Sequence, residues 1–152
     1  MRLVLALLLL VLPAAALAEP LAVKVGVLRQ AHSRETLSIQ DIPAEDDALA
    51  GALMGAADNN TTGKFTGQTF ATVDVKLGEG EDPGAALEKL VSEGARLIIV
   101  DLSPDALLTA SERVKASGAL LFNISAPDEC LRVGNCRAYV VPVAPSRAML
   151  AD

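Results

Sequence analysis

Two places in this sequence carry the same strand-then-helix signal, and this repetition constrains the fold more than any other feature. Asp82-Pro83 and Ser103-Pro104 each open a segment whose apolar residues recur at helical spacing. Aspartate and serine are favoured N-caps, and proline is favoured at the first helical position. Between them, residues 97–100 are continuously apolar, which is typical of a strand buried on both faces of a parallel sheet. The chain is therefore predicted to alternate strands with helices.

The same pattern along the rest of the chain predicts an α/β fold. A long polar loop follows the first expected strand, and a turn-rich stretch at 59–68 precedes the second. The expected strands are residues 22–28, 69–77, 96–101, 119–122 and 139–143, and the expected helices are residues 47–60, 82–94 and 103–118. Because βαβ connections are right-handed, this order predicts a doubly wound, mostly parallel sheet with helices on both faces. Ile98 and Ile99 are then expected to be buried on opposite faces, since side chains alternate along a strand.

The predicted helix at 47–60 is expected to lie close to the sheet. Gly51 and Gly55 are one turn apart, and their lack of a side chain would allow a close approach. The buried stripe of this helix is expected to contain Leu49, Leu53, Ala56 and Ala57.

The N-terminus has the features of a secretory signal peptide. Arg2 supplies a short charged region, residues 3–12 are apolar, and Ala16-Leu17-Ala18 is a small-x-small cleavage site. The apolar run is too short for a membrane span, which needs about 20 residues. We therefore expect cleavage after Ala18, a periplasmic location, and no membrane insertion of the mature chain that begins at Glu19.

The charge and the motifs of the mature chain exclude several classes of protein. Without residues 1–18 the chain has 12 basic and 19 acidic residues, a net charge of −7, which argues against binding to nucleic acid or anionic membranes. The sequence has no glycine-rich phosphate loop, no nucleophile elbow and no metal-ligand cluster. His32, the single histidine, is interpreted as a solvated loop residue. We therefore predict no catalytic residue, no metal, no cofactor and no enzymatic activity.

The two cysteines, Cys130 and Cys136, are close together in the sequence. Exported proteins meet an oxidising compartment, so an even pair favours a disulfide. Gly134-Asn135 between them is able to turn. Free thiols are the alternative, and a metal site is disfavoured because His32 lies far away in the sequence.

Polar residues follow two of the predicted central strands. In doubly wound sheets, ligands bind at the carboxyl ends of the strands, near the point where the strand order reverses. That rule selects the loops after Leu28, Val100 and Phe122. The candidate ligand-binding residues in the last two loops are Leu102, Ser103, Asn123, Ser125 and Ala126. Both serines have an alternative role, because Ser103 is placed to cap a helix and Ser125 to cap a turn.

Several segments resemble type I periplasmic solute-binding proteins, the ligand-binding components of ABC transporters. Residues 47–70, DALAGALMGAADNNTTGKFTGQTF, resemble the first helix of that family, with a turn and a glycine-bearing hairpin leading into the second strand. More narrowly, LRQAHSRETLSIQD, DNNTTGKFTGQ, GEGEDPGAAL, LLFNISAPDECLR and APSRAMLAD resemble the substrate-binding protein associated with pyrroloquinoline-quinone-dependent alcohol dehydrogenase systems. The resemblance covers essentially the whole mature chain, and DNNTTGKFTGQ is its most specific part.

The resemblance implies a domain plan and a function. Residues 19–144 would form the first of two lobes, and residues 145–152 would start the crossover toward a second lobe that is missing here. The implied role is the substrate-binding component of an ABC transporter linked to periplasmic alcohol oxidation. Its partners would be a small solute, gripped at the strand ends that face the second lobe, and an ABC permease in the inner membrane. The alternative is a periplasmic accessory or sensor protein of the same oxidation system that transports nothing.

Overall fold

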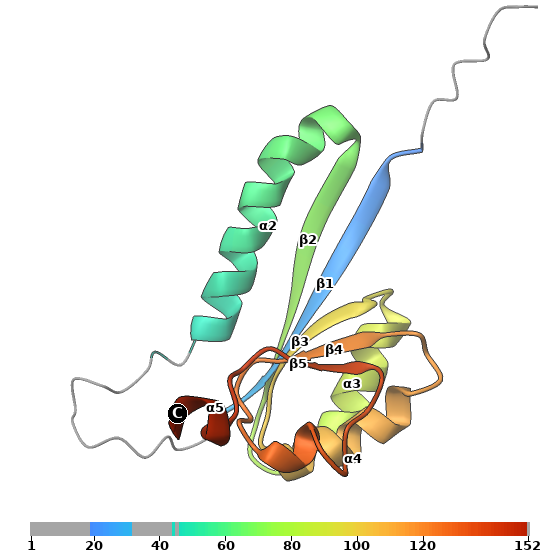
Figure 1. Cartoon of the computed structure of the whole chain (residues 1–152). Coiled ribbons are helices and arrows are strands. Elements are labelled where there is room, and N and C mark those ends of the chain that lie inside the picture. The colour runs from blue at the N-terminus through green and yellow to red at the C-terminus, as the bar shows by residue number, and fades with distance from the viewer. Residues whose placement is uncertain (1–18, 32–43, 45, 152) are drawn as a thin grey trace, which may run out of the picture.

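The computed structural model describes residues 19–31, 44 and 46–151, and it has an α/β fold. Figure 1 shows the strands side by side, with helices on either side of them. The strands are β1 (Leu21–Gln30), β2 (Gln68–Leu77), β3 (Leu97–Asp101), β4 (Leu120–Asn123) and β5 (Val140–Pro142). The helices are α2 (Asp47–Thr66), α3 (Pro83–Ser92), α4 (Pro104–Val114), the 3-10 turn η3 (Glu129–Leu131) and α5 (Arg147–Ala151). The predicted alternation of strands and helices is confirmed.

The five strands form one sheet in the order β2-β1-β3-β4-β5, and all neighbouring pairs are parallel. The strand order reverses between β1 and β3, which is the switch point of a doubly wound sheet. The predicted fold class is therefore confirmed.

One face of the sheet carries the main hydrophobic core. Helices α3 and α4 pack against each other and against this face. Leu87 and Leu90 of α3 and Leu107 of α4 are fully buried there, together with Ile98 and Leu121 from the sheet. We call this the closed face, because two helices cover it.

The opposite face carries α2, which is longer than the sequence analysis predicted. The helix continues through residues 59–66, where a turn and a hairpin were expected, and it ends at Gly67 with φ of +68°. Polar side chains in this stretch are satisfied inside the helix: Asn59 Nδ2 donates to the Gly55 carbonyl at 2.8 Å, and Thr61 Oγ1 to the Asp58 carbonyl at 2.6 Å. The expected turn was wrong because these side chains do not divert the backbone from its helical bonds.

Small residues seat α2 on the sheet, but they are not the ones predicted. Gly63 is buried, and a Cβ there would come within 2.2 Å of the Gln68 carbonyl oxygen, whereas Gly51 and Gly55 have nothing within 4 Å. The expected apolar stripe was also partly wrong, because Leu53 is 52% exposed and Ala57 is exposed. The close approach therefore occurs about two to three turns later than the glycine spacing suggested.

Asn60 fastens α2 to the open edge of the sheet. Its Nδ2 donates to the Phe70 carbonyl at 2.8 Å, and its Oδ1 accepts from the Phe70 backbone N–H at 2.7 Å. Phe70 lies on β2, which is an edge strand. A side-chain amide therefore occupies backbone groups that an exposed edge would otherwise offer to another strand.

Ile98 and Ile99 do point to opposite faces, but they are not equally buried. Ile98 is fully buried on the closed face, whereas Ile99 is only half-buried. The expectation that both are fully buried was wrong for Ile99, because α2 lies over β2 and β1 and barely reaches β3. Helices cover both faces of the sheet, but one of the two faces is covered only in part.

Candidate functional site

The loops after β3 and β4 meet at the carboxyl edge of the sheet, as the sequence analysis predicted. The Ser125 hydroxyl donates to the Leu102 carbonyl at 3.3 Å, so the two loops are tied together directly. Ser103 follows Leu102 and is exposed, and Ser125 is partly buried. The structure thus brings Leu102, Ser103 and Ser125 together, and it leaves the Ser103 side chain accessible.

Asn123 and Ala126 hold the shape of the loop after β4. Asn123 is 1% exposed; its Nδ2 donates to the Ala126 carbonyl at 2.8 Å, and its Oδ1 accepts from the Ala126 N–H at 2.9 Å and the Ser125 N–H at 3.3 Å. The Asn123 carbonyl also accepts from the backbone N–H groups of Val143 and Ala144. These polar groups are therefore used within the loop, and Asn123 and Ala126 position Ser125.

A groove of about 590 Å³ opens between the N-terminal end of α3 and one side of α4. It reaches the carboxyl edge of the sheet through Gln30, at the end of β1, and through Ser103. Its floor and walls are completed by Asp82, Pro83, Gly84, Asp105, Ala106, Thr109, Ala110 and Arg113. Ser103 is the one residue of the five predicted ligand contacts that lines this groove.

Two helix N-termini border the groove, and each has the predicted cap. Asp82 Oδ1 accepts from the Gly84 N–H at 2.9 Å, and Ser103 Oγ accepts from the Ala106 N–H at 3.4 Å. The bond from the Gly84 N–H is the main reason why the pKa of Asp82 is lowered, and Arg113 lowers it further. The 3.4 Å bond is long, so the Ser103 oxygen is weakly held by its cap.

Arg113 of α4 forms the opposite wall of the groove, and sequence reasoning missed it. Its guanidinium contacts Asp82 and donates to both carboxylate oxygens of Glu88, at 3.0 and 2.6 Å. These contacts raise the pKa of Arg113, with the Glu88 hydrogen bond as the largest cause. The partners are 25 and 31 residues away in sequence, so no local pattern could have identified this ion pair.

A second charged pair lies at the same edge of the sheet, on the face that α2 covers. The Arg29 guanidinium donates through Nε and an Nη to the two oxygens of Asp74, each at 2.8 Å. This bidentate contact joins β1 to β2, and the hydrogen bond to Asp74 is the largest cause of the raised pKa of Arg29. Asp46 and Asp101 raise it further. Arg29, the first residue after Leu28, is therefore held in an ion pair with Asp74.

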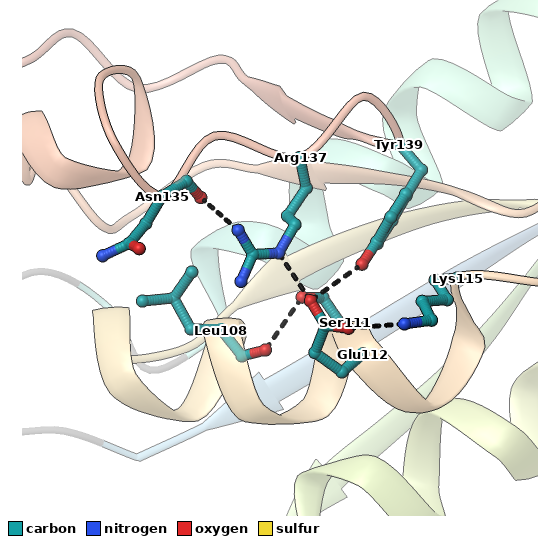
Figure 2. A network of polar contacts seen from close by, with 7 residues as sticks. All are labelled: Leu108, Ser111, Glu112, Lys115, Asn135, Arg137 and Tyr139. Atoms are coloured by element: carbon teal, nitrogen blue, oxygen red, sulfur yellow. Dashed lines mark hydrogen bonds and ion pairs between the residues drawn. The ribbon is translucent and has the colours of Figure 1, made fainter.

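The predicted disulfide is not present: Cys130 and Cys136 are both free and exposed. The segment between them is closed by a backbone bond instead, in which the Asn135 N–H donates to the Cys130 carbonyl at 2.9 Å. Figure 2 shows how its end is attached to α4: Glu112 accepts from Arg137 Nε at 2.6 Å and from Lys115 Nζ at 3.1 Å. This short loop therefore keeps its shape without a covalent bridge.

The part of the chain that the structure describes offers no group of three or more metal-binding side chains and no helix of the length and apolarity needed to cross a bilayer. His32 and the expected signal peptide at 1–18 lie outside the described residues. The remaining candidate for function is the carboxyl edge, with its groove and the two loops that carry Ser103 and Ser125.

This chain is similar to known proteins in three-dimensional structure but not detectably in sequence. No protein-family model matches the sequence, and no curated protein is significantly similar to it. A branched-chain amino acid transporter substrate-binding protein from Streptococcus pneumoniae, solved with isoleucine, has a TM-score of 0.58 at 19% identity, over 78% of this chain and 32% of that chain.

Two further solved structures show the same likeness. An ABC transporter substrate-binding protein from Desulfitobacterium hafniense, in complex with leucine, has a TM-score of 0.59 at 17% identity, over 82% of this chain and 35% of that chain. A leucine-, isoleucine-, valine-, threonine- and alanine-binding protein from Brucella ovis has a TM-score of 0.53 at 18% identity, over 85% and 33%. This chain spans about one third of the length of these proteins, and over that third it has the fold of the substrate-binding proteins of ABC transporters.

Proposed function

We propose that this chain is the first lobe of a periplasmic solute-binding protein that delivers a small solute to an ABC permease and has no enzymatic activity. The observation that supports this most directly is the bond from Ser125 to the Leu102 carbonyl, which joins two loops at the carboxyl edge of a sheet with the order β2-β1-β3-β4-β5. Ligands bind at that edge in sheets of this order. The likeness to three amino acid or ABC substrate-binding proteins supports the same function.

The solute is proposed to lie over the two loops, with the five predicted residues in two roles. Ser103 and Ser125 would contact it, because the first is exposed and weakly held by its cap and the second bonds the carbonyl of Leu102, the residue before Ser103. Asn123, Ala126 and Leu102 would hold the loops in place from beneath, since all three are buried. The N-terminus of α4 would favour an anionic group such as a carboxylate.

The chemical class of the solute is the most specific part of the proposal. Two of the solved relatives are bound to leucine or isoleucine, so a small amino acid is one candidate. The segment DNNTTGKFTGQ instead supports a link to quinoprotein alcohol oxidation, with short alcohols, aldehydes and carboxylates as candidates. Both classes include a carboxylate, which the same loop chemistry would accept.

A second lobe is proposed to complete the site. Residues 145–152 would begin the connection toward it, which is consistent with a chain that matches only one third of the solved proteins. Export with cleavage after Ala18 would bring the lobe to the periplasm. One lobe alone leaves a ligand open to water, so we expect it to bind solutes weakly.

The test is calorimetry on this lobe joined to a second lobe from a related two-lobe protein, titrated with amino acids, short alcohols, aldehydes and carboxylates. Ser125→Ala should weaken binding by about 1–3 kcal/mol, because a buried polar partner on the ligand is left without its hydrogen bond. Ser92→Ala is the matched control, since Ser92 Oγ only donates to the Lys89 carbonyl at the far end of α3.

Unchanged affinity in Ser125→Ala would exclude the assigned contact. Tight binding by the single lobe would contradict the two-lobe site, and turnover of any solute would contradict the non-enzymatic role. Binding without transfer to a permease would favour the accessory or sensor protein.

A further inference from the structure

The chain directly after β5 is bonded to the residues that follow β4. We call residues 143–149 the post-β5 segment. The Asn123 carbonyl accepts from the first two backbone N–H groups of this segment, at 2.9 and 3.0 Å, and the Pro127 carbonyl accepts from the Arg147 N–H at 3.1 Å. Asn123 and Pro127 lie on either side of Ser125 in the sequence. The segment is therefore attached to the loop after β4 on both sides of the proposed solute contact.

One charged side chain, that of Glu129 in η3, binds the segment where α5 begins. Glu129 Oε1 accepts from the Ala148 N–H at 3.0 Å, and the carboxylate also accepts from the Ser146 hydroxyl, which is the largest cause of the lowered pKa of Glu129. Ser146 is 1% exposed, and its Oγ accepts from the Met149 N–H at 3.3 Å, as an N-cap does. Glu129 therefore holds both the cap and the first turn of α5.

The order of α5 depends on these contacts. The N–H groups of Arg147 and Ala148 lie in the first turn of α5, where a helix offers no carbonyl of its own. They donate instead to Pro127 and Glu129, which follow β4. A five-residue helix is also too short to be stable by itself. The start of α5 is thus held by the same stretch of backbone that carries Ser125.

The turn that carries Glu129 has a fixed position of its own. Leu131 is 5% exposed and belongs to the hydrophobic core. The guanidinium of Arg132, the next residue, donates to the Ala144 carbonyl and so binds the post-β5 segment at a second place. Glu129 and Arg132 therefore grip the segment from a turn that the core anchors.

We infer that Glu129 couples the loop that carries Ser125 to the post-β5 segment, so that the two open and close as one unit. This inference rests on the proposed function, in which a solute contacts the loop and the segment leads toward a second lobe. A solute that stabilises the loop would then stabilise the start of that connection by the same coupling free energy. Glu129 is a positioning residue in this scheme, because it acts through the backbone of the loop and touches no solute.

Amide hydrogen exchange of the purified chain, followed residue by residue with NMR near pH 7, tests the coupling. In the wild type the N–H groups of Arg147 and Ala148 should be protected, although both lie in a first helical turn. Glu129→Ala should speed exchange at Ala148 at least about tenfold, because a hydrogen bond to a charged acceptor is lost. Glu129→Gln keeps an acceptor oxygen and should retain most of the protection. Glu93→Ala is the matched control, since Glu93 is exposed at the end of α3 and bonds through its backbone N–H and carbonyl.

The readout that is specific to coupling lies in the loop. The N–H groups of Ser125 and Ala126 donate to Asn123 Oδ1, at 3.3 and 2.9 Å. Glu129→Ala and Ser146→Ala should each speed exchange of these two N–H groups at least about twofold, the lower end of the coupling expected between packed sites. Ser146→Ala changes no residue of the loop, so faster exchange there reports the connection between the two segments. Unchanged exchange of the β3 amides excludes global unfolding as the cause.

Two outcomes would overturn the inference. One is unprotected exchange of the Ala148 N–H in the wild type, because the segment would then not be held. The other is release of Ala148 while the loop amides keep their wild-type rates, since Glu129 would then anchor α5 alone. These measurements use neither a solute nor a second lobe, so their failure leaves the proposed function standing. A two-lobe protein that binds no solute would contradict the proposed function and leave the exchange results unaffected.

Discussion

The closed face of the sheet and the face that carries α2 follow different packing rules within one chain. On the closed face, large side chains such as Leu87, Leu90 and Ile98 fill the space between helix and sheet and are fully buried. On the other face, α2 rests on small residues, and only Ala48 and Gly63 of its 20 residues are buried. The closed face has a core of fully buried side chains, whereas on the α2 face the described residues Leu97, Leu120 and Val141 are 36–38% exposed.

The largest expected effect contrasts two neighbouring isoleucines on these faces. Ile98→Ala should lower the free energy of unfolding by about 2–5 kcal/mol, because it leaves a cavity in a fully buried core. Ile99→Ala should cost clearly less, since its side chain is only half-buried. Urea denaturation at low protein concentration measures both. Equal losses would show that the two faces are equally packed and would contradict this expectation.

An intermediate effect is expected where α2 touches the sheet. Gly63→Ala should destabilise by about 1–3 kcal/mol, because its Cβ would meet the Gln68 carbonyl oxygen and the helix end would have to move. Gly51→Ala, on the same helix, meets open space and should stabilise by about 0.5–1 kcal/mol through helix propensity. The melting temperatures of the two variants compare a glycine that contacts the sheet with a glycine of the same helix that does not. If Gly51→Ala destabilised the protein and Gly63→Ala did not, the close contact of α2 would lie at the earlier glycines.

The smallest effect concerns the helix starts of the closed face. Ser103→Ala should lower stability by about 1 kcal/mol through loss of the N-cap. The folded pKa of Asp82 lies below its ordinary value of 3.8, so the stability it contributes is fully present above that pH and is lost as the pH falls through the lowered pKa. Asp82→Asn keeps a capping oxygen without the charge. Melting temperatures from about pH 2 to pH 7 should therefore show a shallower acid decline in Asp82→Asn, and parallel curves would contradict this role.

Local sequence signals were sufficient wherever the controlling interaction is itself local. Asp82-Pro83 and Ser103-Pro104 start helices where predicted, because each cap bonds an N–H two or three residues ahead. The continuous apolar run at 97–100 forms the central strand, since burial on a parallel sheet requires no polar alternation. The same locality placed Leu102, Ser103 and Ser125 at one edge, because parallel strands all end there.

The sequence by itself determined the order of the strands and helices and the doubly wound class, and from these it predicted the edge at which we propose that a ligand lies. Tertiary structure alone decided where α2 ends, because its last turns are held by Phe70 and Gln68 of the next strand. It also decided that Asn123 holds a loop, that Arg113 spans two helices and that Ile99 is less buried than Ile98. These features depend on distances between residues that are remote in sequence, or on which helix reaches which strand. The hydrophobic periodicity of a sequence carries no information about either.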